Sequence, residues 1–347
     1  MQFEVETQPL GRQQYSPWGR TGYDLLVPLG LYGFTLLAIV TVNFLLPRAM
    51  PGDPLNALFD AGSLSYLAAE GLRSQMARYY GLDLPLGQQY LAYLGNLLRG
   101  DLGWSISLNA PVGELIAGHL PWTILIMLPS VLLSTAVSLV VGGHAGWVRG
   151  SVTDKGLLVA FVTLGTVPVY LVGIALLLLF GVRLGWLPIS GAHTLFGVYG
   201  SPLEQLLDLL AHLALPVGSL TLTMIGRDFL LARASMITVM GEDFMLVARA
   251  KGLADSTLEY RHGLRNALLP VFTRFSLKMG TAVSGAVLVE TLFAYPGMGR
   301  LMFNAVASRD YPVLQGCFLV AGVGVLLANM AADLTYRWID PRTRRRT

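Results

Sequence analysis

Long runs without a charged side chain constrain this sequence more than any other feature. Residues 25–46, 121–148 and 156–182 contain no Asp, Glu, Lys or Arg, and residues 312–334 contain only Asp333. Each run is long enough to cross the roughly 30 Å hydrocarbon core of a bilayer as a helix, which needs about 20 apolar residues. Because a helix satisfies its own backbone polar groups, the four runs predict membrane spans.

Two further stretches predict spans although they carry charges. They are residues 209–234, with Arg227 near one end, and residues 271–293, which contain Lys278 and Glu290. Only 13% of the chain is charged, against about 25% in a typical soluble domain. The sequence therefore predicts an all-α integral membrane protein with six transmembrane helices. Lys278 is close enough to one end of its span for us to expect it to snorkel into water.

The basic residues predict the orientation of these spans. With the N-terminus inside, 17 of the 24 Lys and Arg residues fall on the cytoplasmic side, as the positive-inside rule requires. The chain then divides into a cytoplasmic tail (1–24), a transmembrane domain (25–342) and a basic tail (343–347). The first tail lacks the basic region and cleavage site of a secretory signal. We expect a multi-pass inner (plasma) membrane protein with both termini in the cytoplasm.

Several function classes find no support in the residues. The net charge of +3 is too small to indicate nucleic-acid binding, and one cysteine, Cys317, excludes a disulfide framework. The five histidines are scattered, so we expect neither a metal site nor a catalytic site. No Gly-x-x-x-x-Gly-Lys-Ser/Thr phosphate loop occurs. If ATP powers this protein, another chain hydrolyses it, and no cofactor is expected here.

The polar loop between the fourth and fifth predicted spans, residues 242–270, has the clearest local signals. Glu242 and Asp243 open its first half and Arg249 lies near the end of it, which suits the dipole of a short helix. Gly252 then supplies the left-handed residue that commonly ends a helix. A cytoplasmic helix followed by a glycine turn is predicted.

A second short helix is predicted after that turn. Ser256 and Glu259 have the spacing of a capping box, and Pro270 marks the entry to the fifth span. The cations of the pair are Arg249, Lys251, Arg261, His262 when protonated, and Arg265. Physical chemistry alone leaves two interpretations open: an interfacial helix pair that binds anionic membrane lipids, or a rigid projection that another protein grips.

The motifs of this loop resemble those of a known family. The loop reads Ala248-Arg249-Ala250-Lys251-Gly252-Leu253, then His262-x-Leu264-Arg265-Asn266-Ala267-Leu268-x-Pro270. This is similar to the coupling motif of the dipeptide/oligopeptide/nickel permease family of ABC importers. Further motifs follow the family order: Pro51-Gly52-Asp53-Pro54, Gly185-Trp186-Leu187-Pro188, Glu290-Thr291-x-Phe293-x-Tyr295-Pro296-Gly297-Met298-Gly299-Arg300 and Arg309-Asp310-Tyr311-Pro312.

This resemblance implies the type I importer permease fold, with cytoplasmic coupling helices and a long first external loop. It implies three kinds of partner besides membrane lipids: a second homologous permease, two cytoplasmic ATPases that bind ATP and Mg, and an extracytoplasmic substrate-binding protein. The expected role is import of di- or oligopeptides, with nickel or a metal chelate as the alternative. The coupling residues it implies are Ala248, Arg249, Ala250, Lys251, Gly252, Leu253, Asp255, Ser256, Glu259, Arg261, His262, Arg265 and Asn266.

The sequence departs from the broader importer motif at one point, because Leu246 stands where that motif has a glutamate. Outside the loop, four residues are candidates for the translocation pathway or an external gate: Glu290, Tyr295, Arg300 and Asp310. For Glu290, a structural role in holding the following turn is the other interpretation.

Two other classes of function are weaker alternatives. A secondary transporter more often shows two related halves with broken spans, and no internal repeat is visible. An intramembrane enzyme needs a nucleophile beside a base. Ser284 lies in a Ser-Gly pair of the fifth span, but no span histidine is placed to activate it, so a small-residue packing seam is the better interpretation.

Overall fold

The computed structural model describes residues 23–49 and 84–339, and in these ranges all regular structure is helical. The predicted all-α class is confirmed. The first helices are α1 (Tyr23–Ala49), α4 (Leu86–Leu98), α5 (Val112–Trp147), α6 (Val152–Thr166), α7 (Val169–Leu176) and the π-helical η1 (Leu177–Arg183). There follow α8 (Pro202–Met240), α9 (Asp243–Ala250), the π-helical η2 (Thr257–Leu264), α10 (Arg265–Leu292), α11 (Met298–Ala307) and α12 (Tyr311–Ile339).

Three described helices are long and apolar enough to cross a membrane: α5, α8 and α12 as far as Ala331. Helices α6, α7 and η1 form a fourth candidate if they are taken as one bent span. The apolar part of α1, Gly30–Leu45, is shorter. The tails 1–24 and 343–347 lie outside the described residues, except for Tyr23 and Asp24 at the start of α1.

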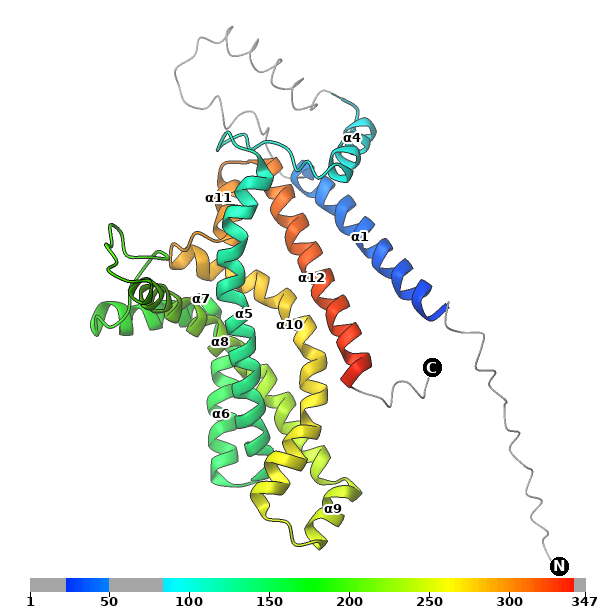
Figure 1. Cartoon of the computed structure of the whole chain (residues 1–347), viewed down its shortest axis with the longest axis vertical. Helices are drawn as coiled ribbons and strands as arrows, with labels where there is room; N and C mark the ends of the chain where they lie inside the picture. Colours follow the sequence, from blue (N-terminus) through cyan, green and yellow to red (C-terminus); the bar gives the residue numbers. More distant parts are fainter. Residues whose placement is uncertain (1–22, 50–83, 340–347) are drawn as a thin grey trace, which may run out of the picture.

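The predicted span 156–182 is not one straight helix. It is broken between α6 and α7, whose directions differ by 103° (Figure 1). Pro168 explains the break, because its ring excludes the helical conformation for the residue before it. Val167 is accordingly extended, with φ −74° and ψ 130°. Helix α7 starts directly after Pro168 and leaves the line of α6.

Other proline residues lie inside helices, so that one helix extends beyond the span predicted for it. Helix α5 begins at Val112 and not at Pro121, which lies inside it together with Pro129. Glu114 lies in the first turn of α5, where a carboxylate favours the helix dipole.

A stripe of small residues explains why α5 packs along α8. Every fourth residue of α5 on this face is Ser or Gly, and all five are buried: Ser130, Ser134, Ser138, Gly142 and Gly146. The hydroxyl of Ser138 donates to the carbonyl oxygen of Ile225 at 3.1 Å. A Cβ on Gly142 would lie 2.7 Å from the carbonyl oxygen of Phe229. Such small residues let two helix backbones approach closely, as membrane helices often do.

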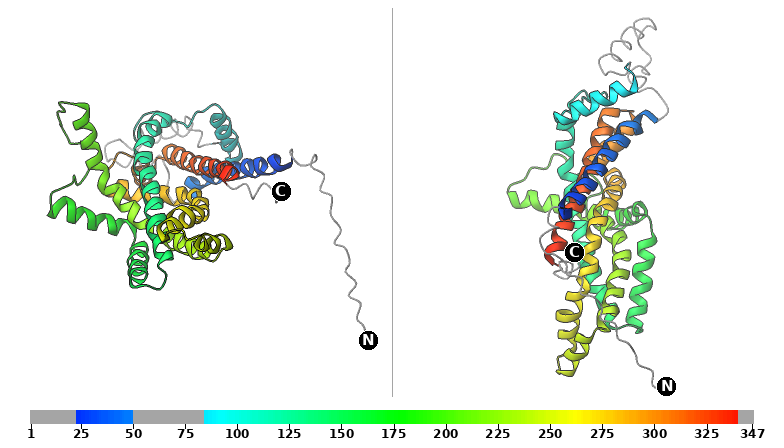
Figure 2. Two further views of the ribbon diagram at one scale, coloured as in Figure 1. Left: turned by 60° about the horizontal axis from the view of Figure 1, so that its bottom comes forward. Right: turned by 90° about the vertical axis from the view of Figure 1, so that its right-hand side faces the viewer.

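Two groups of short helices lie at opposite ends of α5 (Figure 1). Helix α9 and its turn lie at one end, and α4 and α11 lie at the other (Figures 1 and 2). Helices α1 and α12 run side by side, with Asn43 donating to the carbonyl oxygen of Gln315 at 2.7 Å. The long α5, α8 and α10 therefore connect the two ends.

Candidate functional site

Residues 242–266 form a hairpin, called here the α9 hairpin. Glu242 precedes α9 in an extended conformation, and Asp243 opens the helix as predicted. The helix ends at Ala250, and Gly252 has a φ of +73°, in the left-handed region that L-residues with a side chain rarely adopt. The predicted glycine turn is confirmed.

The second half of the α9 hairpin differs from the prediction. Ser256 is itself helical, with φ −60° and ψ −37°, and its side chain makes no capping bond, so the capping box is wrong. Helical structure begins at Asp255, passes through η2 and continues into α10 without a break. Pro270 lies inside α10 and does not start it. The hairpin is therefore α9, a glycine turn and an extension of α10.

Glu259 is used to fasten this hairpin to α5. Its carboxylate oxygen Oε1 lies 2.8 Å from Nδ1 of His144, in the last turn of α5. Glu259 is buried, whereas the side chain of His144 is 40% exposed. Nearby, the guanidinium of Arg249 lies 5.5 Å from the ring centroid of Trp147, the last residue of α5.

Apolar packing fixes the hairpin further. Met245, Ala248 and Leu258 are buried together, with Trp147 and Val239 packed against them. Deeper in, a Cβ on Gly143 of α5 would lie 2.5 Å from a methyl carbon of Leu264. Contacts of this kind join the hairpin to α5, α8 and α10 at once. The hairpin is a rigid continuation of the helix bundle.

The structure brings all thirteen predicted coupling residues into this hairpin. Ala248 and Glu259 face inward, and His262 is half-buried. The exposed ones are Arg249, Ala250, Lys251, Gly252, Leu253, Asp255, Ser256, Arg261, Arg265 and Asn266. Exposed apolar side chains that the motif did not single out lie among them: Phe244, Leu246, Val247 and Tyr260. A mixed apolar and cationic surface of this kind suits a protein partner as well as lipid.

The opposite end of the bundle is organised around two buried carboxylates. Residues 290–313, called here the α11 cap, contain both. The first is Glu290. Its Oε2 accepts a hydrogen bond from the backbone N–H of Arg300, in the first turn of α11, at 3.1 Å. A Cβ on Gly297 would collide with this carboxylate. A carboxylate at a helix N-terminus binds the free N–H groups there.

Asp310 is the second carboxylate, and it is fully buried. Its Oδ2 accepts hydrogen bonds from the hydroxyl of Ser105 at 2.6 Å and from the backbone N–H and hydroxyl of Ser107 at 2.8 and 2.7 Å. It stands directly before α12 and joins this helix to the loop between α4 and α5.

Tyr295 and Arg300, the other two gate candidates, lie in the same cap. Tyr295 is buried and meets Trp122 edge to face, with ring centroids 5.8 Å apart. Burial raises the pKa of the Tyr295 phenol, and the neighbouring carboxylate of Glu290 adds to this effect. The guanidinium of Arg300 donates to the carbonyl oxygen of Ala294 at 2.6 Å.

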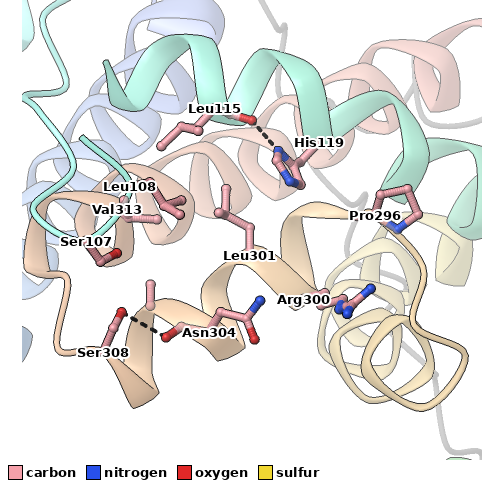
Figure 3. A pocket seen from close by; sticks show the side chains of 12 residues that line it. Ser107, Leu108, Leu115, His119, Pro296, Arg300, Leu301, Asn304, Ser308 and Val313 are labelled. Atoms are coloured by element: carbon pink, nitrogen blue, oxygen red, sulfur yellow. Dashed lines mark hydrogen bonds between the residues drawn. The ribbon is translucent and has the colours of Figure 1, made fainter. Parts of the chain in front are cut away.

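A cavity of about 350 Å³ opens beside this cap (Figure 3). Arg300 and Asn304 line it from α11, and Ser107 and His119 line it from the opposite side. His119 is held by a hydrogen bond from Nδ1 to the carbonyl oxygen of Leu115 at 2.6 Å. The cavity gathers polar groups of three separate chain segments at one end of the bundle.

Lys278 does not snorkel, so that expectation is wrong. Its side chain is buried, forms an ion pair with Asp228 of α8 and donates to the hydroxyl of Thr135 at 3.0 Å. Asp228 was missed because the fourth span was assigned from its apolar content. The signal that could have revealed this pair was an acid, Asp228, in the fourth predicted span and a lysine, Lys278, in the fifth.

Within residues 23–49 and 84–339, no group of three or more His, Cys, Asp and Glu could hold a metal ion.

Several membrane-crossing helices with polar structures at both ends define the chain as a multi-pass membrane protein. Residues 135–345 match the family described as "Binding-protein-dependent transport system inner membrane component". The chain belongs to this family, which confirms the resemblance seen in its motifs. It is therefore a transport component of the inner membrane and not an enzyme.

Curated relatives cover nearly the whole chain. It is 36% identical to the di/tripeptide transport system permease protein DppB of Pseudomonas aeruginosa, over 91% of this chain and 97% of the relative. It is 35% identical to the oligopeptide transport system permease protein AppB of Bacillus subtilis, over 88% and 94%. It is 34% identical to the dipeptide transport system permease protein DppB of Escherichia coli, over 92% and 98%.

Proposed function

We propose that this chain is a permease subunit that forms half of the translocation pathway of an ATP-driven importer of di- or oligopeptides. The names of the three relatives support this class of solute. The observation that carries the proposal is the α9 hairpin, because it is rigidly joined to three long helices and exposes an apolar and cationic surface. Nickel or a metal chelate, the alternative within the family, has no support from a described metal site.

Six membrane spans in the type I arrangement are part of this proposal. In support, each predicted range overlaps a described helix or a bent helix pair: α1, α5, α6 with α7 and η1, α8, α10 and α12. Helix α10 has 28 residues, enough to cross a bilayer, and two of its four charged residues, Lys278 and Glu290, are buried and partnered within the chain.

The partners follow from the two ends of the bundle. The α9 hairpin faces the cytoplasm, where one of two ATPase subunits grips it and supplies ATP and Mg. The α11 cap faces outward, where the substrate-binding protein docks. A second homologous permease completes the pathway. Nucleic acid has no place in this assembly.

The mechanism is alternating access driven through a rigid lever. When ATP closes the ATPase dimer, the α9 hairpin moves as one body, because its buried residues hold it to α5, α8 and α10. The three helices carry the motion across the bilayer and open the pathway outward. Hydrolysis and release of the ATPases return the pathway to its inward-facing form.

The test uses Gly252→Val in the complete transporter, reconstituted in proteoliposomes with its binding protein. Valine at a φ of +73° costs about 1–2 kcal/mol and distorts the turn after α9, although no atom lies close enough to clash with its Cβ. We expect normal membrane insertion and ATPase activity, but import of Ala-Ala per ATP reduced by about tenfold, within the range usual for a coupling free energy.

A matched control is Gly150→Val. Gly150 has a φ of +85° and open space around it, but it lies in the short turn between α5 and α6. It should cause the same strain and leave the ratio of import to ATP hydrolysis unchanged. If Gly252→Val couples normally, or if both variants uncouple equally, the hairpin is not the coupling element.

A further inference from the structure

A second cavity, of about 280 Å³, lies among the membrane-crossing helices and shares no lining residue with the cavity beside the α11 cap. Helices α8 and α10 form two of its walls, and the break between α6 and α7 forms the third, with Gly165 and Val169. Four ionisable side chains line it: Arg227, Asp228, Arg274 and Lys278. A cavity with this many charges is unusual inside a membrane-spanning bundle.

Two of these charges neutralise each other, and two do not. Lys278 pairs with Asp228 across the cavity, from α10 to α8. Arg227 and Arg274 have neither an ion-pair nor a hydrogen-bond partner in the described part of the chain. The cavity therefore carries two guanidinium groups available to an anion. Arg274 and Lys278 are four residues apart and share one face of α10.

The position of Arg227 indicates that the cavity meets water. Its side chain is exposed, although it lies within the predicted span 209–234 of α8. An arginine in a span normally faces a water-filled cavity or the interior of the bundle, because exposure to lipid costs much free energy. The face of α8 and α10 around this residue is thus a wall of an aqueous pathway.

Close packing fixes the third wall beside these charges. A Cβ on Gly226 would lie 2.5 Å from the carbonyl oxygen of Phe161 and 2.7 Å from Cα of Gly165. Helix α6 therefore touches α8 directly before Arg227 and then turns away at Pro168. The turn leaves the space that the cavity occupies.

Both charged walls are mechanically joined to the α9 hairpin. Helix α8 leads into α9 through two residues, and η2 runs directly into α10. A movement of the hairpin is therefore transmitted to the two helices that carry Arg227 and Arg274. This is what a site on an alternating pathway requires, whereas a site for a structural lipid gains nothing from it.

We propose that this cavity is a carboxylate-binding subsite on the pathway. Arg227 and Arg274 bind the carboxylate of the transported solute, and Asp228 positions Lys278 beneath them. A guanidinium matches a carboxylate with two parallel hydrogen bonds, and every linear peptide carries a carboxylate at its C-terminus. The choice of a peptide carboxylate as the ligand rests on the proposed function. The positive charge of the cavity and its access to water do not depend on it.

The first experiment measures access and charge with a single cysteine. Thr223→Cys lines the cavity, and Cys317→Ala removes the buried native thiol. The experiment uses the complete complex in proteoliposomes and two methanethiosulfonate reagents, one with a sulfonate group and one with a trimethylammonium group. The ratio of the sulfonate rate to the trimethylammonium rate should be higher at this cysteine than at a cysteine in neutral surroundings. Changing both Arg227 and Arg274 to Gln should lower this ratio at least about fivefold.

Arg183→Gln is the control, because it removes an exposed cation at the end of η1, away from the cavity. It should leave the ratio unchanged. No reaction at Thr223→Cys would overturn the assignment of an aqueous wall. A ratio that stays the same after both arginines are replaced would overturn the anion site.

The second experiment identifies the anion. Ala-Ala should slow the sulfonate reagent at least about threefold, and Ala-Ala amide should not, since it lacks the carboxylate. Vesicles of phosphatidylcholine, with or without phosphatidylglycerol, should give equal rates. Protection by phosphatidylglycerol but not by Ala-Ala would assign the cavity to a lipid headgroup and overturn the proposal.

Uptake separates this inference from the proposed function. If the native complex imports no Ala-Ala with ATP, the proposed function is wrong. The ratio of the two reagent rates still tests the anion site independently. If the native complex imports Ala-Ala and the double variant of Arg227 and Arg274 imports it with the same KM, the subsite fails and the proposed function stands.

Discussion

The two ends of the bundle are held in different ways. At the α11 cap, Glu290 and Asp310 have no solvent exposure, and Asp310 alone accepts three hydrogen bonds from residues of the loop between α4 and α5. At the α9 hairpin the main polar link is one pair, Glu259 with His144, whose imidazole is 40% exposed. Apolar contacts supply the rest.

This difference separates stability from transmission. A buried carboxylate with several donors is costly to remove, because each donor is left without a partner in a dry environment. A half-exposed pair contributes little to stability, since water can replace either partner. We infer that the α11 cap stabilises the fold, whereas the α9 hairpin is fixed just firmly enough to transmit movement.

The largest effect should come from Asp310→Ala. Removing this carboxylate leaves the buried hydroxyl of Ser105 and two donors of the exposed Ser107 without their acceptor, which should cost about 2–3 kcal/mol. We expect little folded protein in the membrane and a much lower midpoint of thermal unfolding for what remains. Asp310→Asn keeps an acceptor oxygen and should lose about half as much.

Asp101→Ala is the control for that variant. Asp101 lies in the same loop and accepts one hydrogen bond, from the backbone N–H of Gly103 at 2.8 Å, but it is exposed. It should cost about 1 kcal/mol or less. Equal midpoints for Asp310→Ala and Asp101→Ala would remove the distinction between the two ends of the molecule.

Local chemistry explains which parts of this structure could be predicted from the sequence. Charge-free runs of more than 20 residues located the helices, and Gly252 marked its turn because only glycine is relaxed there. The boundaries were less certain, because a proline acts differently by position. Pro168 breaks a helix, whereas Pro129 lies inside α5.

Contacts distant in sequence could not be predicted in this way. Glu259 was assigned to a local capping box, but its partner lies 115 residues earlier in the chain. Asp310 and Ser105 are 205 residues apart. Local propensity contains no information on such pairs. The stripe from Ser130 to Gly146, by contrast, was visible as a repeat of four and was overlooked.

An intermediate effect is expected from Glu259→Ala, which tests the hairpin side of the comparison. His144 keeps access to water, so the loss of stability should be about 1 kcal/mol or less. Coupling should suffer more, because η2 loses its polar link to α5. We expect import per ATP to fall about fivefold, the lower end of common coupling free energies, in the same proteoliposome assay.

Glu242→Ala serves as its control, since Glu242 is an exposed acid of the same hairpin whose side chain makes no capping bond. It removes an acid of the same charge, but from the surface that the ATPase would grip, whereas Glu259 is buried. A similar loss of coupling in both variants would mean that surface charge matters and the link to α5 does not.

The smallest effect on transport should come from Arg300→Ala, at the rim of the cavity beside the α11 cap. Its guanidinium makes one hydrogen bond, to the carbonyl oxygen of Ala294, so the fold should lose about 1–2 kcal/mol. If the cap receives the binding protein, the concentration of loaded binding protein that half-maximally stimulates the ATPases should rise about threefold at low salt and less at high salt.

Arg309→Ala is the matched change, because Arg309 is an exposed cation in the turn that follows α11 and lines no part of that cavity. A rim charge acts through the rate of encounter, so the two variants should differ only if docking is centred on the cavity. Unchanged stimulation in Arg300→Ala would leave the cap with a purely structural role. The two ends of the molecule would then differ in function as sharply as they differ in how they are held.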